Sequence, residues 1–337
     1  MGKKELIEDY IDLAKKLGSK IEDVQGGGGN ISIKVSSTDM YIKASGSLLK
    51  DIDKKNIGAH INYEKIKKKL QLHLKNKSTG AIEKKIDSHI QENTHTLDKK
   101  ASIETSMHIL LPGKIVFHNH SIYINIFSCS KNGEKHFEQL FGEKINFIRY
   151  ASPGAGLSRR IYKKHGLASP QTLILENHGI IIHSDNKEEI ITTYLSTKKK
   201  IKDFLKKKGI KLFENGLIQG GKGITWGTLS PHNMLKKFII KNKLSKHMYP
   251  DSIVFGEDIL FDGVKNYIQG DKIVINTGNT KKDISILENL VAINYILYVH
   301  DTLGFKSKFL GAKEIKYILN MDQEKYRKSL YVIEKKL

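Results

Sequence analysis

Strand-type and helix-type patterns alternate along this chain, and that alternation constrains the fold more than any other feature. Apolar residues recur at helical spacing over residues 5–17, where Gly18 ends the pattern. Ile31, Ile33 and Val35 instead alternate with polar residues, which predicts a strand with one apolar face. Because both kinds of element recur to the end of the chain, the sequence predicts an α/β or α+β protein.

The same patterns predict the elements that follow the first strand. Strands are expected within residues 39–49, 114–119, 145–150, 171–176 and 180–183. Helices are expected within residues 64–77, 102–111, 133–141, 154–165 and 186–209. The rest of residues 53–100 is polar and rich in lysine, and we expect it to be loop or an inserted segment.

A glycine-rich break at residues 214–227 marks the expected end of the main domain. Beyond it, residues 251–261 and 271–278 have strand-type patterns, whereas residues 284–304 and 311–330 have helical ones. We therefore expect a main domain over residues 1–215 and an α/β extension over residues 216–337.

Lysine dominates the charge of the chain, which has 57 basic and 36 acidic residues and a formal net charge of +21. The basic side chains include only four arginines, at positions 149, 159, 160 and 327. Arginine is the side chain best suited to bidentate hydrogen bonds with phosphates and base edges. Acidic residues are also interleaved with the lysines. The composition therefore favours solvated lysine faces over a nucleic-acid-binding surface.

The sequence also bears on the location of the protein. No apolar run approaches the roughly 20 residues that a membrane helix needs, and the N-terminal residues lack the apolar core of a secretory leader. Cys129 is the only cysteine, so no intrachain disulfide can form. These features predict a cytoplasmic protein that is not inserted in a membrane.

Two histidines stand one residue apart in the apolar segment "VFHNHS". Side chains alternate faces along a strand, so His118 and His120 are expected to project together while Asn119 points away. Such a pair can supply two nitrogens to one metal ion, although buried histidines also occur as ordinary core residues. His178, in "LENHG" at the end of another predicted strand, is a candidate third ligand. Glu104, in "SIETSMH", is either a metal ligand, a general base or a residue that favours the start of a helix.

Two short loops have the composition of ligand-binding turns. The segment "GGGGN" before Ile31 either cradles an anion with backbone N–H groups or serves as a flexible linker, and the strand that follows directly favours ordered structure. It lacks the Gly-Lys-Ser/Thr of a phosphate-binding loop, and a strand follows where a dinucleotide-binding loop has a helix. The segment "KASG" at residues 43–46 places a lysine beside a small polar turn.

Taken in order, six segments resemble the class II aldolase/adducin family: "GGGGNIS", "YIKASGSLL", "SIETSMH", "VFHNHS", "YASPG" and "LENHGIIIH". The resemblance implies a three-layer α/β/α sandwich with a mainly antiparallel central sheet, which would form the catalytic domain. The segments "YPDSIVFGED" and "EKYRKSL" look like the tail of the longer, rhamnulose-phosphate-aldolase-like members. Members usually form C4 tetramers with the active site at a subunit interface.

The resemblance also implies a set of site residues. The family's zinc histidines correspond to His118, His120 and His178, and its catalytic glutamate corresponds to Glu104. Its anion site corresponds to Gly29, Asn30, Ser45, Gly46 and Ser102. Ile103 stands where phosphate-binding members commonly have a second serine, which removes one donor to the anion. Either Lys43 compensates as a point charge or the ligand is not phosphorylated.

The implied reaction is the reversible aldol cleavage of a ketose or ketose phosphate through a metal-stabilised enediolate, with Glu104 moving the proton. Zn²⁺ is the implied metal, and histidine nitrogens also suit Mn²⁺, Co²⁺ and Fe²⁺. The same fold and metal site serve epimerases, dehydratases and decarboxylases that act on sugars or sugar acids. Adducin-like scaffolds share the fold but lack the zinc ligands, all of which this sequence retains.

Overall fold

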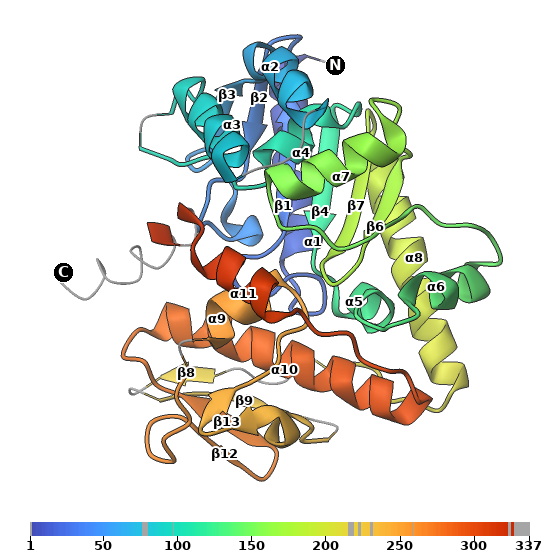
Figure 1. The fold of residues 1–337 in the computed structure, drawn as a ribbon, viewed down its shortest axis with the longest axis vertical. Helices are drawn as coiled ribbons and strands as arrows, with labels where there is room; N and C mark the ends of the chain where they lie inside the picture. The colour runs from blue at the N-terminus through green and yellow to red at the C-terminus, as the bar shows by residue number, and fades with distance from the viewer. Residues whose placement is uncertain are drawn as a thin grey trace.

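A seven-stranded sheet forms the centre of the computed structural model, which describes residues 2–75, 80–96, 98–214, 219–221, 224–229, 232–257, 259–322 and 325–326. The strand order is β3-β2-β1-β4-β7-β6-β5, and only the β5–β6 pair is parallel. The strands are β1 (Asn30–Lys34), β2 (Asp39–Ile42), β3 (Ala59–Asn62), β4 (Ile115–Asn119), β5 (Phe147–Ile148), β6 (Thr172–Leu175) and β7 (Gly179–Ser184). Figure 1 shows the sheet in the upper half of the molecule.

Helices cover both faces of this sheet because β4, β6 and β7 are apolar on both sides. In β4, Ile115 and Phe117 pack into the core on one face, and Val116 packs into the core on the other. The first face is covered by α1 (Lys3–Gly18), α5 (Ile122–Ser128) and α8 (Lys187–Lys207), and α10 (Thr280–Leu303) packs on α5. The second is covered by α2 (Tyr63–Lys75), α3 (Gly80–Glu92), α4 (Thr105–Leu110) and α7 (Ala155–His165). The predicted three-layer sandwich with a mainly antiparallel sheet is confirmed.

The chain after α8 forms a C-terminal extension that packs against the sandwich. It contains a four-stranded antiparallel sheet of order β12-β13-β9-β8, seen with α9 and α10 in the lower part of Figure 1. Its elements are β8 (Gln219–Gly221), β9 (Ile224–Thr228), β10 (Ile239–Ile240), β11 (Lys243–Leu244), α9 (Pro250–Gly256), β12 (Tyr267–Gln269), β13 (Lys272–Ile275), α10 and α11 (Ala312–Leu319). The boundary expected at residue 215 lies outside the described residues, so the division into two domains stays a prediction.

Two expectations about local structure are wrong. Residues 251–261 were expected to form a strand, but α9 occupies the first part of that range. The consecutive apolar residues of α9 resemble those of a buried strand. Two features nevertheless start a helix here: Pro250 lies in the first turn, and the Ser252 hydroxyl accepts a hydrogen bond from the N–H of Tyr249 at 3.3 Å. Asp251 and the other residues of the helix are all buried, which removes any periodic pattern.

The polar region at residues 53–100 is also more ordered than expected. It contains β3, which pairs with β2 at the edge of the sheet, and α3, which packs against α2. In α3 only Ile86 and Ile90 are buried among the residues whose exposure is described, and they join Ile66 and Leu70 of α2 in one core. Because the apolar face of α3 is so narrow and the rest of the helix is polar, the sequence shows only a weak helical periodicity there.

The extension shares one continuous core with the central sheet. Ile286 and Leu290 of α10 belong to the same cluster as Phe117 and Ile180 of the sheet. At the end of α10, the ring of His300 donates from Nε2 to the carbonyl of Ile126 at 2.5 Å, while Nδ1 lies 2.8 Å from the hydroxyl of Ser307. Among the described helices, none combines the length and apolar character needed to cross a bilayer.

We expect His300 to make the protein less stable in weak acid. Burial lowers the pKa of His300 to about 4, whereas an unfolded histidine titrates near 6.5. Between those values the unfolded chain binds the proton and the folded chain does not, so the free energy of unfolding falls by about 3 kcal/mol as the pH drops from 6.5 to 4. Urea unfolding of the protein and of His300→Gln across this range measures the effect. A constant difference between the two proteins at every pH would contradict it.

Candidate metal centre

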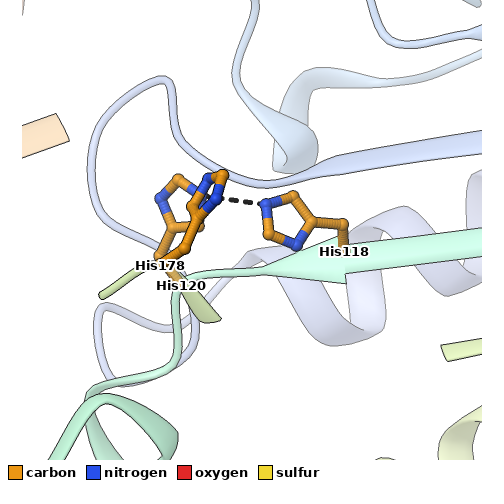
Figure 2. A group of neighbouring side chains, drawn as sticks. All are labelled: His118, His120 and His178. Atoms are coloured by element: carbon orange, nitrogen blue, oxygen red, sulfur yellow. Dashed lines mark hydrogen bonds between the residues drawn. The ribbon is translucent and has the colours of Figure 1, made fainter. Parts of the chain in front are cut away.

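The antiparallel pairing of β4 with β7 brings the three predicted histidines together. His118 pairs with Ile181, and Asn119 pairs with Ile180. Continuing that register, His120 just after β4 lies opposite Gly179, the first residue of β7, and so next to the turn that carries His178. Figure 2 shows the three rings converging at the end of β4.

The distances between the rings suit ligation of one ion. Ring centroids lie 4.9 Å apart for His118 and His120, 4.8 Å for His118 and His178, and 4.9 Å for His120 and His178. The Nε2 atoms of His118 and His120 are 3.0 Å apart, and two nitrogens bound to one tetrahedral zinc are about 3.3 Å apart. One ligand atom from each of the three residues lies within 4.8 Å of the others.

Hydrogen bonds and burial favour neutral imidazoles with a nitrogen lone pair at the centre. The Nδ1 atom of His118 lies 2.9 Å from the carbonyl of Ile180, which can only accept, so this Nδ1 carries the proton and Nε2 is free to bind a metal. Burial lowers the pKa of His118, and burial together with His118 and His120 lowers the pKa of His178 well below its usual range. Neutral histidine is the form that binds metal ions.

Glu104 lies beside the three histidines, at the start of α4. Its Oε1 is 3.3 Å from Nε2 of His178, and its Oε2 is 3.5 Å from Nε2 of His118. The carboxylate is buried, and within the described part of the chain Oε1 accepts no hydrogen bond. A buried oxygen that no donor satisfies, next to three imidazole nitrogens, fits a site for a divalent cation.

Of the predicted substrate-binding residues, Asn30 and Ser102 lie beside Glu104, and Ser45 lies beside the segment that leads to Ser102. The Asn30 side-chain amide donates to the Ser102 hydroxyl, which also accepts from the backbone N–H of Glu104 at 3.3 Å. The N–H of Ser45 donates to the carbonyl of Lys100 at 2.9 Å, beside the Ala44–Ala101 bridge. Ser102 and Lys100 line a cavity of about 250 Å³. The substrate-binding role of these residues stays a prediction.

Comparison with known proteins agrees with this architecture. Residues 9–199, more than half of the chain, match the family model described as the Class II Aldolase and Adducin N-terminal domain. The chain belongs to the class II aldolase and adducin family. A curated Bacillus subtilis relative named "Uncharacterized oxidoreductase YuxG" is 27% identical over 193 residues, which cover 54% of this chain and 27% of the relative. The chain thus spans about a quarter of the length of that relative.

Solved structures of class II aldolases are more distant. An N-terminal class II aldolase domain of a Thermoplasma acidophilum protein has 21% identity and a TM-score of 0.49, and covers 59% of this chain and 93% of its own. An L-fuculose 1-phosphate aldolase has 19% identity and a TM-score of 0.41, and covers 62% of this chain and 90% of its own.

The remaining predicted substrate residues lie in loops that pack tightly. Gly29 has φ of +66°, and a Cβ on it would lie 3.1 Å from the carbonyl oxygen of His118. Gly46 turns with φ of +83°. The Lys43 ammonium is buried and donates to the carbonyls of Gly27 and Ser47, at 2.9 and 2.7 Å. This lysine therefore ties the glycine loop to the loop that follows β2.

Ile103 contributes an apolar side chain beside the predicted anion site. A Cβ on Gly154, just before α7, would lie 3.1 Å from the Ile103 carbonyl oxygen and 3.2 Å from its Cγ1. Ile103 thus packs beneath the "YASPG" turn, at the position where phosphate-binding family members commonly have a serine.

Three residues at the centre were missed by the sequence analysis, and two of them belong to the extension. Asp251 accepts from Nδ1 of His120 at 2.6 Å, and Glu288 of α10 accepts from the N–H of Gly26 at 2.5 Å. Asn177 lies in the turn that presents His178 and has φ of +51°. Its side-chain amide donates hydrogen bonds to two carbonyls of the extension, those of Met248 and Lys308. No local pattern links Asp251 or Glu288 to its partner, because more than a hundred positions separate each pair in the sequence.

A second group of possible ligands lies at the edge of the sheet. Asp39 Oδ1 is 3.1 Å from Nε2 of His60 and 3.9 Å from Nε2 of His95. These side chains are partly exposed, between 28% and 51%. Since they could take up a transition metal in solution, any metal count has to separate them from the buried triad.

Proposed function

We propose that this chain is a metal-dependent lyase that catalyses reversible aldol cleavage of a ketose or ketose phosphate. The observation that supports the proposal best is the buried convergence of His118, His120 and His178 beside the Glu104 carboxylate. Three imidazoles with an adjacent carboxylate match the donor set of a catalytic zinc site that keeps one position open for substrate.

In this proposal His118, His120 and His178 hold the metal, and Glu104 moves the proton. A bound divalent ion supplies Lewis-acid stabilisation of the charge that develops on substrate oxygens as the carbon–carbon bond breaks. During cleavage the substrate hydroxyl that becomes the aldehyde carbonyl loses its proton to solvent, and Glu104, protonated from solvent, gives a proton to the carbon next to the ketone carbonyl; during condensation Glu104 removes that proton as a general base. No lysine forms a Schiff base in this scheme, so borohydride is not expected to trap an adduct.

The rest of the pocket is proposed to recognise the sugar. Asn30 and Ser102 are proposed to bind a hydroxyl or an anion, and their hydrogen bond to each other beside Glu104 supports this role. Because the side chain of Ile103 offers no hydrogen-bond donor to a phosphate, both free and phosphorylated sugars have to be tested as substrates. Epimerase, dehydratase and decarboxylase reactions use the same metal chemistry, and each gives a different product in the same assay. Zn²⁺, a cytoplasmic location and a homotetramer are part of the proposal.

We expect one metal ion per buried triad and loss of turnover when a chelator removes it. The measurement is elemental analysis of His60→Ala/His95→Ala protein, in which the exposed cluster is gone, followed by a screen of ketoses and ketose phosphates for aldehyde release. Activity that survives complete metal removal would contradict the proposal. Release of CO₂ or water, or inversion of a stereocentre, without aldehyde would replace the aldolase assignment with the matching alternative.

A further inference from the structure

Of the residues in the extension, Asp251 makes the most direct contact with the proposed metal centre. Its Oδ2 lies 2.6 Å from Nδ1 of His120, and the two side chains are each 5% exposed. The glycine loop closes over this contact: a Cβ on Gly28 would lie 2.1 Å from the Asp251 oxygen and 2.8 Å from the His120 nitrogen. The pair is therefore tightly enclosed, and a charged hydrogen bond is stronger in such surroundings than in water.

We propose that Asp251 is a positioning residue that fixes His120 for metal binding, so that the C-terminal extension completes the metal centre. The inference rests on the proposed function, because it assigns Asp251 to the same metal site. His118 and His120 then differ in their outer partner: a backbone carbonyl holds Nδ1 of His118, and a carboxylate holds Nδ1 of His120.

A carboxylate at Nδ1 acts on the ring in two ways. It accepts a hydrogen bond from the Nδ1–H group, which keeps the proton on Nδ1 and leaves a lone pair on Nε2, the atom that lies 3.0 Å from Nε2 of His118. It also raises the electron density on the ring and orients it, which strengthens the bond to a metal. With Glu104, Asp251 brings a second carboxylate to the centre, so three neutral imidazoles and two carboxylates can offset the charge of a divalent cation.

The position of Asp251 is set by contacts at the start of α9. Before the helix, the N–H groups of Met248 and Tyr249 donate to the Ser252 hydroxyl at 3.1 and 3.3 Å, which fixes the first turn. The Met248 carbonyl accepts from the Asn177 amide at 2.7 Å, next in sequence to His178. Residues 248–251 therefore contact both the side chain of His120 and the turn that carries His178. A precise metal site requires rigid support of this kind.

The experiment compares Co²⁺ binding to the His60→Ala/His95→Ala protein, in which the exposed group of possible ligands is gone, with binding to the same protein carrying Asp251→Asn or Asp251→Ala. We expect both substitutions to weaken Co²⁺ binding by about 10- to 100-fold, the range found for outer-shell partners of metal ligands, and to change the visible absorption of bound Co²⁺. The Asp251→Asn substitution keeps the shape of the side chain but removes its charge, so it separates positioning from packing.

Asp283→Asn is the matched control. Asp283 is an equally buried acid of the extension, 3% exposed, and accepts from the N–H of Thr277 at 2.9 Å. We expect this variant to bind Co²⁺ as the unchanged protein does, even if thermal unfolding shows a loss of stability. If Asp251→Asn is destabilised but binds Co²⁺ with unchanged affinity and absorption, Asp251 has only a structural role and the inference is wrong.

The outcomes separate this inference from the proposed function. Strong Co²⁺ binding by the unchanged protein together with unchanged binding by both Asp251 variants overturns the inference and leaves the metal site intact. Failure of the unchanged protein to bind Co²⁺, Zn²⁺ or Mn²⁺ overturns both.

Discussion

Replacement of Glu104 with glutamine is expected to lower turnover by about 10²- to 10⁴-fold, the usual contribution of a positioned general base, and to leave the proposed metal bound. The amide has nearly the shape of the carboxylate but cannot accept a proton at neutral pH. Its oxygen can still lie near the Nε2 atoms of His118 and His178, which are 3.5 and 3.3 Å from the carboxylate oxygens. The measurement is kcat for aldehyde release, with metal content determined on the same sample.

Glu134→Gln provides the control for this substitution. The Glu134 carboxylate pairs with the exposed Arg149 at 2.7 Å, so its loss is expected to leave turnover unchanged. Full turnover of Glu104→Gln with metal bound would remove Glu104 from the proton transfer. Loss of the metal together with turnover would instead assign Glu104 to ligation, and the general-base role would be wrong.

Replacing His178 with alanine weakens metal binding by at least about 100-fold, because loss of a direct ligand exceeds the 10- to 100-fold effect of outer-shell changes. It also abolishes turnover. The two histidines that remain leave the metal with fewer than the three protein ligands of a catalytic zinc site. Competition with a chelator measures the affinity, and the aldehyde assay measures the activity.

His183→Ala is the matched control, since His183 lies in β7, the strand that directly follows His178, and is also buried. Its Nε2 lies 3.1 Å from the Pro170 carbonyl instead of the triad. We expect this variant to keep its metal even if the protein is less stable. Equal metal binding by His178→Ala and His183→Ala would show that the triad is not the site.

The core of the candidate site could be predicted because its geometry follows from local patterns. Strand alternation places His118 and His120 on one side, and this holds although His120 lies just past the end of β4. His178 was a candidate because it follows a predicted strand, but continuous apolar runs indicate only that strands are buried, so the antiparallel register that brings it to the pair is seen only in the structure. The resemblance to one family then favoured one of the three roles that the sequence had left open for Glu104.

The parts that could not be predicted depend on contacts between distant segments. Nothing near Asp251 in the sequence distinguishes it from a solvent-exposed acid at the start of a helix, where acids are common. The glycine loop illustrates the same point. It was expected to offer N–H groups to an anion, and Gly26 does so, but the anion is the carboxylate of Glu288 from the chain's own α10. Only the folded structure shows which partner occupies such a loop.

The shared core of α10 and the sheet bears on how this protein can be studied in pieces. A fragment that stopped near residue 199, where the family match ends, would lack Asp251, Glu288 and the carbonyls that hold Asn177. It would also expose the faces of Tyr123 and Ile126, which are fully buried in the whole chain. Such a fragment would aggregate readily and would underestimate the metal affinity of the intact polypeptide, however well its sequence aligned with shorter aldolases.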